Sequence, residues 1–60
     1  PDNFTSLGSY EITIENLQCK STLSYKDVDT GLRAVNIIVA WPNGNTGQDK
    51  EFEITSYAVN

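Results

Sequence analysis

The sequence predicts an all-β fold, a three- or four-stranded antiparallel sheet in meander order, from two observations. Apolar and polar residues alternate over several segments, which is the period of a strand with one covered face. Clusters of Gly, Asn, Asp and Pro separate these segments, as turns separate neighbouring strands. No segment has a convincing helical period, and the length allows one domain at most, so residues 1–60 are expected to form a single β-sheet domain.

The first third of the chain predicts one clear strand. Residues 1–8 contain Pro, Asp, Asn, Ser and Gly without a period, which predicts an irregular lead-in. Residues 9–16 alternate as a half-buried strand does. The apolar side of that strand holds Tyr10, Ile12 and Ile14. Residues 17–26 are ambiguous, and they predict only a short strand over Thr22–Tyr25.

The strongest predicted strand covers residues 32–41 and follows a turn signal of Asp, Thr and Gly at 27–31. One side of this strand holds Val35, Ile37, Val39 and Trp41. The other side holds Leu32, Ala34, Ile38 and Ala40, interrupted by Asn36. The β-branched residues and the terminal Pro42 favour a strand over a helix. A strand that is apolar on both sides is expected to be central in its sheet.

A turn cluster at 42–49 precedes the last predicted strand, 51–60. The cluster is too long for a two-residue hairpin, and its glycines allow positive φ. It predicts a surface-exposed loop that contains Asn43, Gly44, Asn45 and Gly47. Segments 32–41 and 50–59 are expected to form one long hairpin. The alternation of the last strand blurs after Ile54, which predicts either a β-bulge or a change of environment near Ser56.

The predicted strands carry more apolar surface than one sheet can cover. The expected core face holds Tyr10, Ile12, Ile14, Val35, Ile37, Val39, Trp41, Phe52 and Ile54. A single sheet needs a second layer against such a face, and a chain this short is marginally stable alone. Cys19 is the only cysteine and closes no intrachain disulfide, so association is the expected source of stability. We expect another chain, a second copy or a further segment to supply the layer.

Composition excludes several functional classes. The net charge is −4, and the four basic residues are scattered, whereas nucleic acid and acidic membranes require clustered positive charge. No apolar run approaches the roughly 20 residues of a membrane-spanning helix. With no histidine and one cysteine, an ordinary zinc site or nucleophile–base pair is not expected. The sequence therefore predicts neither an enzyme nor a cofactor.

Four residues have a functional interpretation beside a structural one. Asp27 and Asp29 alternate as calcium ligands do, but a turn before a strand is the favoured interpretation. Trp41 is either a ligand-stacking residue or, as we favour, an edge of the core. Cys19 is either an intermolecular or reactive thiol or, as we favour, a buried inert one.

The segment GLRAVNIIVAW, followed by PNGNTGQDKEFEITSYAV, resembles the C-terminal end of type IV pilin-like minor pilins and type II secretion pseudopilins. In that family an alternating strand ending in Trp leads through a Gly-containing loop into a last strand. The positions that match the pattern are Asp27, Asp29, Leu32, Arg33, Val35, Ile37, Val39, Trp41, Gly44, Phe52, Ile54, Ser56 and Tyr57. The resemblance covers about half to two-thirds of the chain, and the strand ending in Trp is its most specific part.

The resemblance implies a structural subunit of a type IV pilus or secretion pseudopilus, extracellular or periplasmic in a cell-surface filament. Family members carry a long N-terminal helix, half of it an anchor and half packed on the sheet. This sequence lacks that helix and the prepilin-peptidase site, so the helix is expected from another chain or a missing N-terminal segment. It also lacks the disulfide loop of many major pilins, which favours a minor or divergent member.

The expected partners are a pilin helix and other filament subunits. The residues expected to dock on the helix are Ile12, Ile14, Val35, Ile37, Val39, Trp41, Phe52 and Ile54. The alternative docking face holds Leu32, Ala34, Ile38 and Ala40. The rival function is a small free-standing adhesive or binding module, for example part of an immunoglobulin-like sandwich. Because such a sandwich needs about seven strands, that module would require a strand-exchanged dimer.

Overall fold

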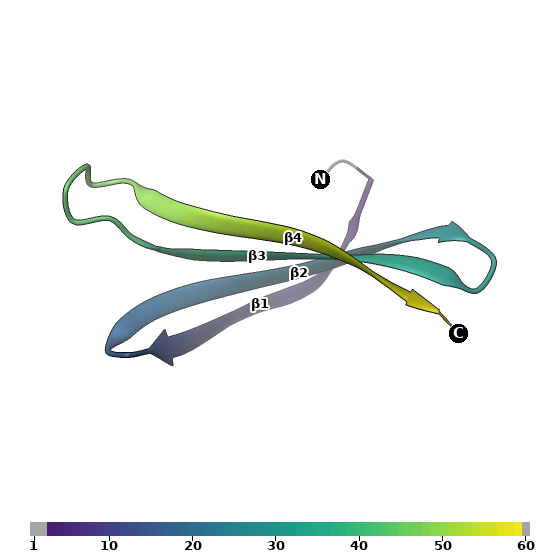
Figure 1. The fold of residues 1–60 in the computed structure, drawn as a ribbon, viewed down its shortest axis with the longest axis horizontal. Helices are drawn as coiled ribbons and strands as arrows, with labels where there is room; N and C mark the ends of the chain where they lie inside the picture. The colour runs from purple at the N-terminus through teal and green to yellow at the C-terminus, as the bar shows by residue number, and fades with distance from the viewer. Residues whose placement is uncertain (1–2, 60) are drawn as a thin grey trace.

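Four antiparallel strands form one sheet in this protein (Figure 1). The computed structural model describes residues 3–59. The strands are β1 (Thr5–Ile14), β2 (Leu17–Asp29), β3 (Leu32–Pro42) and β4 (Asp49–Val59), and the described residues contain no helix. The strand order is β1-β2-β3-β4, so each strand pairs with its neighbours in sequence. The all-β antiparallel meander predicted from the sequence is confirmed, with four strands, and β3 lies inside the sheet as expected.

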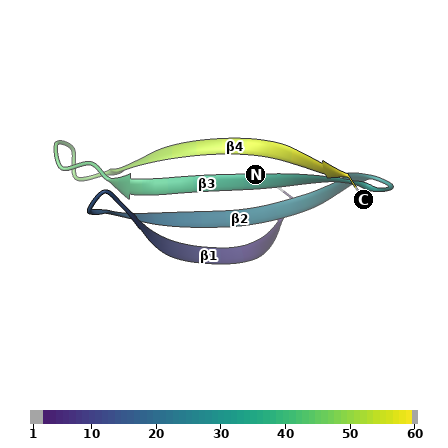
Figure 2. The ribbon, with the colours of Figure 1, turned by 60° about the horizontal axis from the view of Figure 1, so that its bottom comes forward.

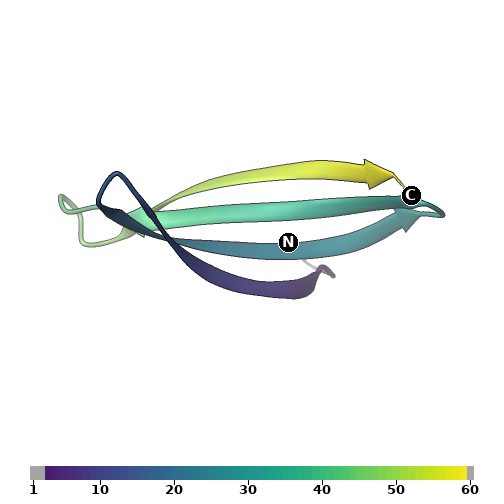
Figure 3. The ribbon, with the colours of Figure 1, turned by 90° about the horizontal axis from the view of Figure 1, so that it is seen from below.

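The described residues make a single layer. Figures 2 and 3 show the four ribbons side by side in one twisted sheet, with no described segment across either face. The radius of gyration is 13.7 Å, whereas a compact domain of this length has about 10 Å. The accessible surface is 4681 Å², whereas a compact monomer of this mass exposes about 3,900 Å². The sheet is therefore an open slab, with extents of 44 × 21 × 15 Å.

A two-residue turn joins β1 and β2 and fixes their register. Ile14 pairs with Leu17, and the turn residues Glu15 and Asn16 have φ of 50° and 67°. Positive φ at both central residues defines a type I′ turn, whose twist matches that of the flanking strands. The predicted strand 9–16 therefore ends at Ile14. The turn was not predicted because Glu-Asn lacks the glycine that usually marks this turn type.

β2 corrects the sequence prediction most strongly. The residues Thr22–Tyr25 lie in a strand as predicted, but the predicted extent is too short, since β2 has 13 residues and is the longest strand. β2 pairs with β1 along one edge and with β3 along the other. These two ladders hold its Ser, Lys and Asp residues in extended conformation although these residue types have weak strand preferences, because tertiary pairing overrides local propensity.

The irregular lead-in predicted for residues 1–8 is wrong for its second half. Thr5 pairs with Tyr25, and the ladder continues through a bulge between Ser6 and Gly8. Gly8 has φ of 133°, and a Cβ there would meet the Tyr10 hydroxyl oxygen at 3.4 Å. Glycine permits this backbone conformation beneath the tyrosine ring. Residues 1–2 of the predicted lead-in lie outside the described residues.

The other two turns lie where the sequence placed them. In the β2–β3 hairpin Asp29 pairs with Leu32, with a register shift at Val28, and Gly31 has φ of 73°. The β3–β4 loop spans 43–48 and is held by its own hydrogen bonds, among them the amide of Gly47 to the carbonyl of Asn43 at 3.1 Å. The first turn is therefore shorter than the predicted range 27–31, whereas the second loop is nearly as long as the predicted range 42–49.

The β3–β4 ladder is continuous from the pair of Leu32 with Val59 to the pair of Pro42 with Asp49, so the hairpin prediction is confirmed. The bulge predicted near Ser56 is wrong, because the register of β4 never shifts. The blurred alternation reflects the other predicted alternative, a change of environment along the strand. Phe52 and Ile54 lie on one face of β4 and Tyr57 and Val59 on the other, because the apolar side changes along the strand.

We predict that an Asn-Gly turn, made by Glu15→Asn with Asn16→Gly, raises the thermal unfolding midpoint. A non-glycine residue in the left-handed region costs about 1–2 kcal/mol, so the gain in unfolding free energy is about 1 kcal/mol. Circular dichroism melts of the variant and the parent chain provide the measurement. The control is Gly47→Ala, which should lower the midpoint because Gly47 has φ of 75°. An unchanged or lower midpoint in the Asn-Gly variant contradicts the turn assignment.

Candidate partner-binding face

One face of the sheet is apolar across all four strands. Directly paired residues of antiparallel strands lie on the same face, so the register defines both faces. We call one the apolar face, and its large side chains are Tyr10, Ile12, Ile14, Leu17, Cys19, Leu23, Tyr25, Val35, Ile37, Val39, Trp41, Phe52 and Ile54. All eight residues expected to dock on a helix belong to this set.

The centre of the apolar face is a row formed by Leu23, Ile37 and Ile54, which pair directly across three strands. Ile37 lies in the inner strand and is half-buried, whereas Ile54 is 49% exposed. On the outer strands Tyr10 is 54% exposed and Phe52 is 57% exposed. No described segment covers these residues, so they form no buried core within the described chain. The expectation that another chain, a second copy or a further segment covers them stays a prediction.

Part of this face was not predicted. Leu17, Leu23 and Tyr25 belong to β2, whose extent was underestimated. Cys19 belongs to the same strand and is 3% exposed, with its thiol 3.6 Å from the carbonyl of Leu17. The signal was present as apolar residues at alternate positions, broken only by Ser21. The burial of Cys19 agrees with the favoured interpretation of an enclosed thiol.

Charged residues lie only at the two ends of the apolar face. Lys50 pairs with Trp41 near the β3–β4 loop. At the opposite end the Arg33 Nε donates to Asp27 Oδ1 at 2.7 Å, and the second bond, from a terminal guanidinium nitrogen to Asp27 Oδ2, is 3.3 Å. The Arg33 guanidinium carbon also lies 4.1 Å from the centre of the Tyr25 ring. The middle of the face is therefore free of charge over the described strands.

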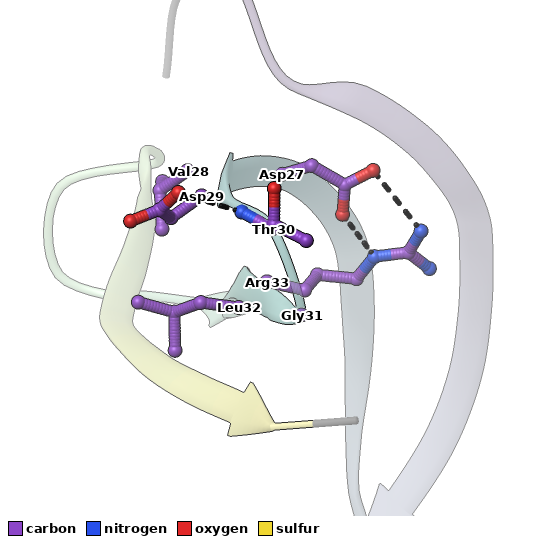
Figure 4. Close-up of a pocket in the computed structure, with 7 residues that line it drawn as sticks. All are labelled: Asp27, Val28, Asp29, Thr30, Gly31, Leu32 and Arg33. Atoms are coloured by element: carbon purple, nitrogen blue, oxygen red, sulfur yellow. Dashed lines mark hydrogen bonds and ion pairs between the residues drawn. The ribbon is translucent and has the colours of Figure 1, made fainter.

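The calcium candidates, Asp27 and Asp29, face different partners. Figure 4 shows the two carboxylates pointing to opposite sides of the β2–β3 turn. Asp27 is paired with Arg33, and Asp29 Oδ1 accepts the amide hydrogen of Thr30 at 2.7 Å. Residues 27–33 line an open hollow of about 520 Å³, but the described residues bring together no three metal-ligating side chains. The arrangement is that of a capped hairpin turn.

The opposite face, which we call the polar face, carries most of the charge. Its rows contain Glu11, Lys20, Lys26, Glu51 and Glu53, with hydroxyl and amide residues between them. The alternative docking residues Leu32, Ala34, Ile38 and Ala40 lie on this face. Ala34 is only 2% exposed, because taller neighbours surround it. Asn36 separates Leu32 and Ala34 from Ile38 and Ala40. Leu32 and Ala34 pair with Val59 and Tyr57, so the apolar residues of this face form small separate patches and not one continuous surface.

Asn36 is the most buried residue of the polar face, at 1% exposure. Its side-chain amide donates to Glu53 Oε2 at 2.9 Å and to Thr55 Oγ1 at 3.0 Å. Its Oδ1 atom is buried and has no hydrogen-bond partner among the described residues. This network explains why a polar residue interrupts the apolar pattern of β3, since the Asn36 side chain links β3 to β4 by hydrogen bonds on the polar face.

The predicted surface loop lies at the end of the β3–β4 hairpin. Gly44, Asn45 and Gly47 are exposed, and Asn43 is half-buried. The Asn43 side chain accepts the amide hydrogen of Asn45 at 3.1 Å, so it closes the loop internally. Trp41, just before the loop, is half-buried on the apolar face, as expected for an edge residue of a hydrophobic surface.

Comparisons of the chain with protein-family models, with curated proteins and with solved structures gave no match. Among the described residues there is no helix that is long and apolar enough to cross a membrane.

We predict an acid-sensitive contribution from the Asp27–Arg33 pair. The hydrogen bond from Arg33 lowers the pKa of the Asp27 carboxyl below that of an unfolded aspartate. The pair therefore stabilises the fold above the unfolded pKa, and this contribution is lost as the pH falls through the folded pKa. NMR titration of the Asp27 carboxyl carbon should give a low midpoint that rises in Arg33→Gln. Equal midpoints in the two proteins contradict the pairing, and salt should reduce the difference because both groups are exposed.

Proposed function

We propose that this chain is the β-sheet part of a filament subunit of the type IV pilin-like class, and that its apolar face packs on an amphipathic α-helix. One observation supports the proposal above the others. The apolar face is continuous over four strands, yet its outer residues remain about half exposed. A soluble monomer rarely leaves an apolar patch of more than a few hundred Å² open, so such a face indicates a partner.

The dimensions of the face suit a helix. Strands lie about 4.8 Å apart, so the outer strands of a four-stranded sheet are separated by roughly 14 Å. A helix with its side chains is about 10–12 Å across. An eleven-residue strand such as β3 extends for roughly 36 Å, which a helix of about 24 residues matches at 1.5 Å per residue. One helix laid along the sheet would therefore cover the central row and reach both charged ends.

The composition of the face suits a protein partner. Tyr10, Tyr25, Trp41 and Phe52 are all on the apolar face. Aromatic residues are enriched at protein interfaces, and charged residues are depleted at interface centres. Both features occur here, since the charges lie at the ends of the face. The helix would therefore contact Leu23, Ile37 and Ile54 at its centre.

The remaining surface suits the outside of an assembly. The polar face carries carboxylates of Glu11, Glu51 and Glu53, and the exposed loop 43–48 projects from one end of the sheet. Carboxylates along exposed strands also discourage unwanted edge pairing. In the proposed filament this face and loop point to solvent or to neighbouring subunits. Catalysis has no part in this function, and assembly is its mechanism.

The test is a titration of the chain with a designed amphipathic helical peptide that has one Leu/Ile face. We expect saturable binding, with Ile54→Asp weakening it at least about tenfold because a carboxylate placed in the apolar contact must lose its hydration. The matched control is Tyr57→Asp, which alters an exposed residue of the same strand on the polar face. Isothermal titration calorimetry gives the dissociation constants.

A peptide of the same composition in scrambled order, which cannot form an apolar helical face, should not bind. Equal weakening by Ile54→Asp and Tyr57→Asp would place the contact elsewhere. A chain that binds no helix and behaves as a stable monomer would instead favour the free-standing binding module.

A further inference from the structure

We infer that two copies of this chain cover each other's apolar face when no helix is bound, which makes an eight-stranded, two-layer sandwich. The inference deepens the proposed function, and it rests on that proposal for the choice of face, because it names the occupant that a helix must displace. The area, charge distribution and shape of the apolar face favour a second copy of the chain as this occupant.

The area agrees with the requirement of a stable dimer. The accessible surface of 4681 Å² exceeds the value for a compact monomer of this mass by about 800 Å². A standard protein interface buries about 800 Å² on each partner. One copy placed on the apolar face would therefore remove about the surface that the open slab exposes in excess. Burial of the two faces also supplies the second layer that a sheet requires.

The charge distribution allows self-association although the chain carries a net charge of −4. On the apolar face Asp27 and Arg33 neutralise each other, and Lys50 is the remaining charge among the described strand residues. The acidic surplus lies on the polar face and in the turns. Two copies stacked through their apolar faces would hold these like charges on opposite outer surfaces, with two sheet thicknesses between them.

The shape of the face supports an isologous contact, in which the same patch serves both copies. One row pairs Tyr10, Ser21, Val39 and Phe52 across the sheet. The short Ser21 side chain leaves a low position between taller ones, whereas the position of Gly8 is covered by the Tyr10 ring. Two sheets of equal twist pack about 10 Å apart with their strands roughly 30° from parallel, so a tall residue of one copy can enter the low position of the other.

The test is sedimentation equilibrium of the full chain at micromolar to near-millimolar concentration. We expect a mass of twice the 6.6 kDa monomer, with strand-rich circular dichroism. Trp41 is the only tryptophan and lies on the apolar face, so its emission should shift to longer wavelength as the dimer dissociates on dilution. This reading needs no substitution and does not depend on a variant that folds.

Two variants locate the contact. Ile54→Asp should raise the dimer dissociation constant at least about tenfold, and Tyr57→Asp should leave it within about twofold. A folded monomer over the whole concentration range overturns the inference. An unfolded chain, or a mass that rises without limit, also overturns it, as does a dimer that Tyr57→Asp disrupts and Ile54→Asp does not.

Addition of the amphipathic helical peptide separates this inference from the proposed function. Conversion of the dimer into a one-to-one peptide complex supports both. A dimer that never binds the peptide supports the inference and contradicts helix docking. A folded monomer that binds the peptide contradicts the inference and supports helix docking.

Discussion

The structure depends on one constraint: a single layer of strands has two faces, and water can satisfy only a polar one. In this chain Leu23, Ile37 and Ile54 form the middle of the other face, and the described residues place nothing over them. The length of the slab, its large accessible surface and the exposure of its outer aromatic residues all follow from that arrangement. This face can consequently bind a partner through the hydrophobic effect, and either proposed occupant would remove the face from water.

The parts of the fold that could be predicted are those where local pattern and tertiary pairing agree. β3 is rich in β-branched residues, β4 alternates over its first half, and a loop rich in glycine and asparagine joins them, so the hairpin was predictable. β2 was not, because its Ser, Lys and Asp residues have no strong strand preference and are held by ladders on both sides. The Glu15–Asn16 turn was missed because its residues adopt positive φ without glycine.

The residues of β1, β3 and β4 on the candidate face were predictable, and so was their need for a covering layer, but Leu17, Leu23 and Tyr25 of β2 were not. Alternation showed which side chains share a face, since period two is a property of any strand. It could not show what lies above that face, which depends on segments and molecules beyond the strand itself. The register also explains the blurred end of β4, where Tyr57 and Val59 join the polar face opposite Ala34 and Leu32. Without cross-strand partners, this change of side is indistinguishable from a bulge.

Asn36 affects the register in which β3 can pair with its neighbours. A slip of β3 by one residue would turn every side chain of the strand to the other face. Asn36 would then stand among aliphatic neighbours, separated from Glu53 and Thr55, while Ile37 would enter the row of serines and threonines. An amide stranded in an apolar setting without partners is costly. This single polar residue therefore specifies the register of β3, because it makes the shifted sheet less stable than the correct one.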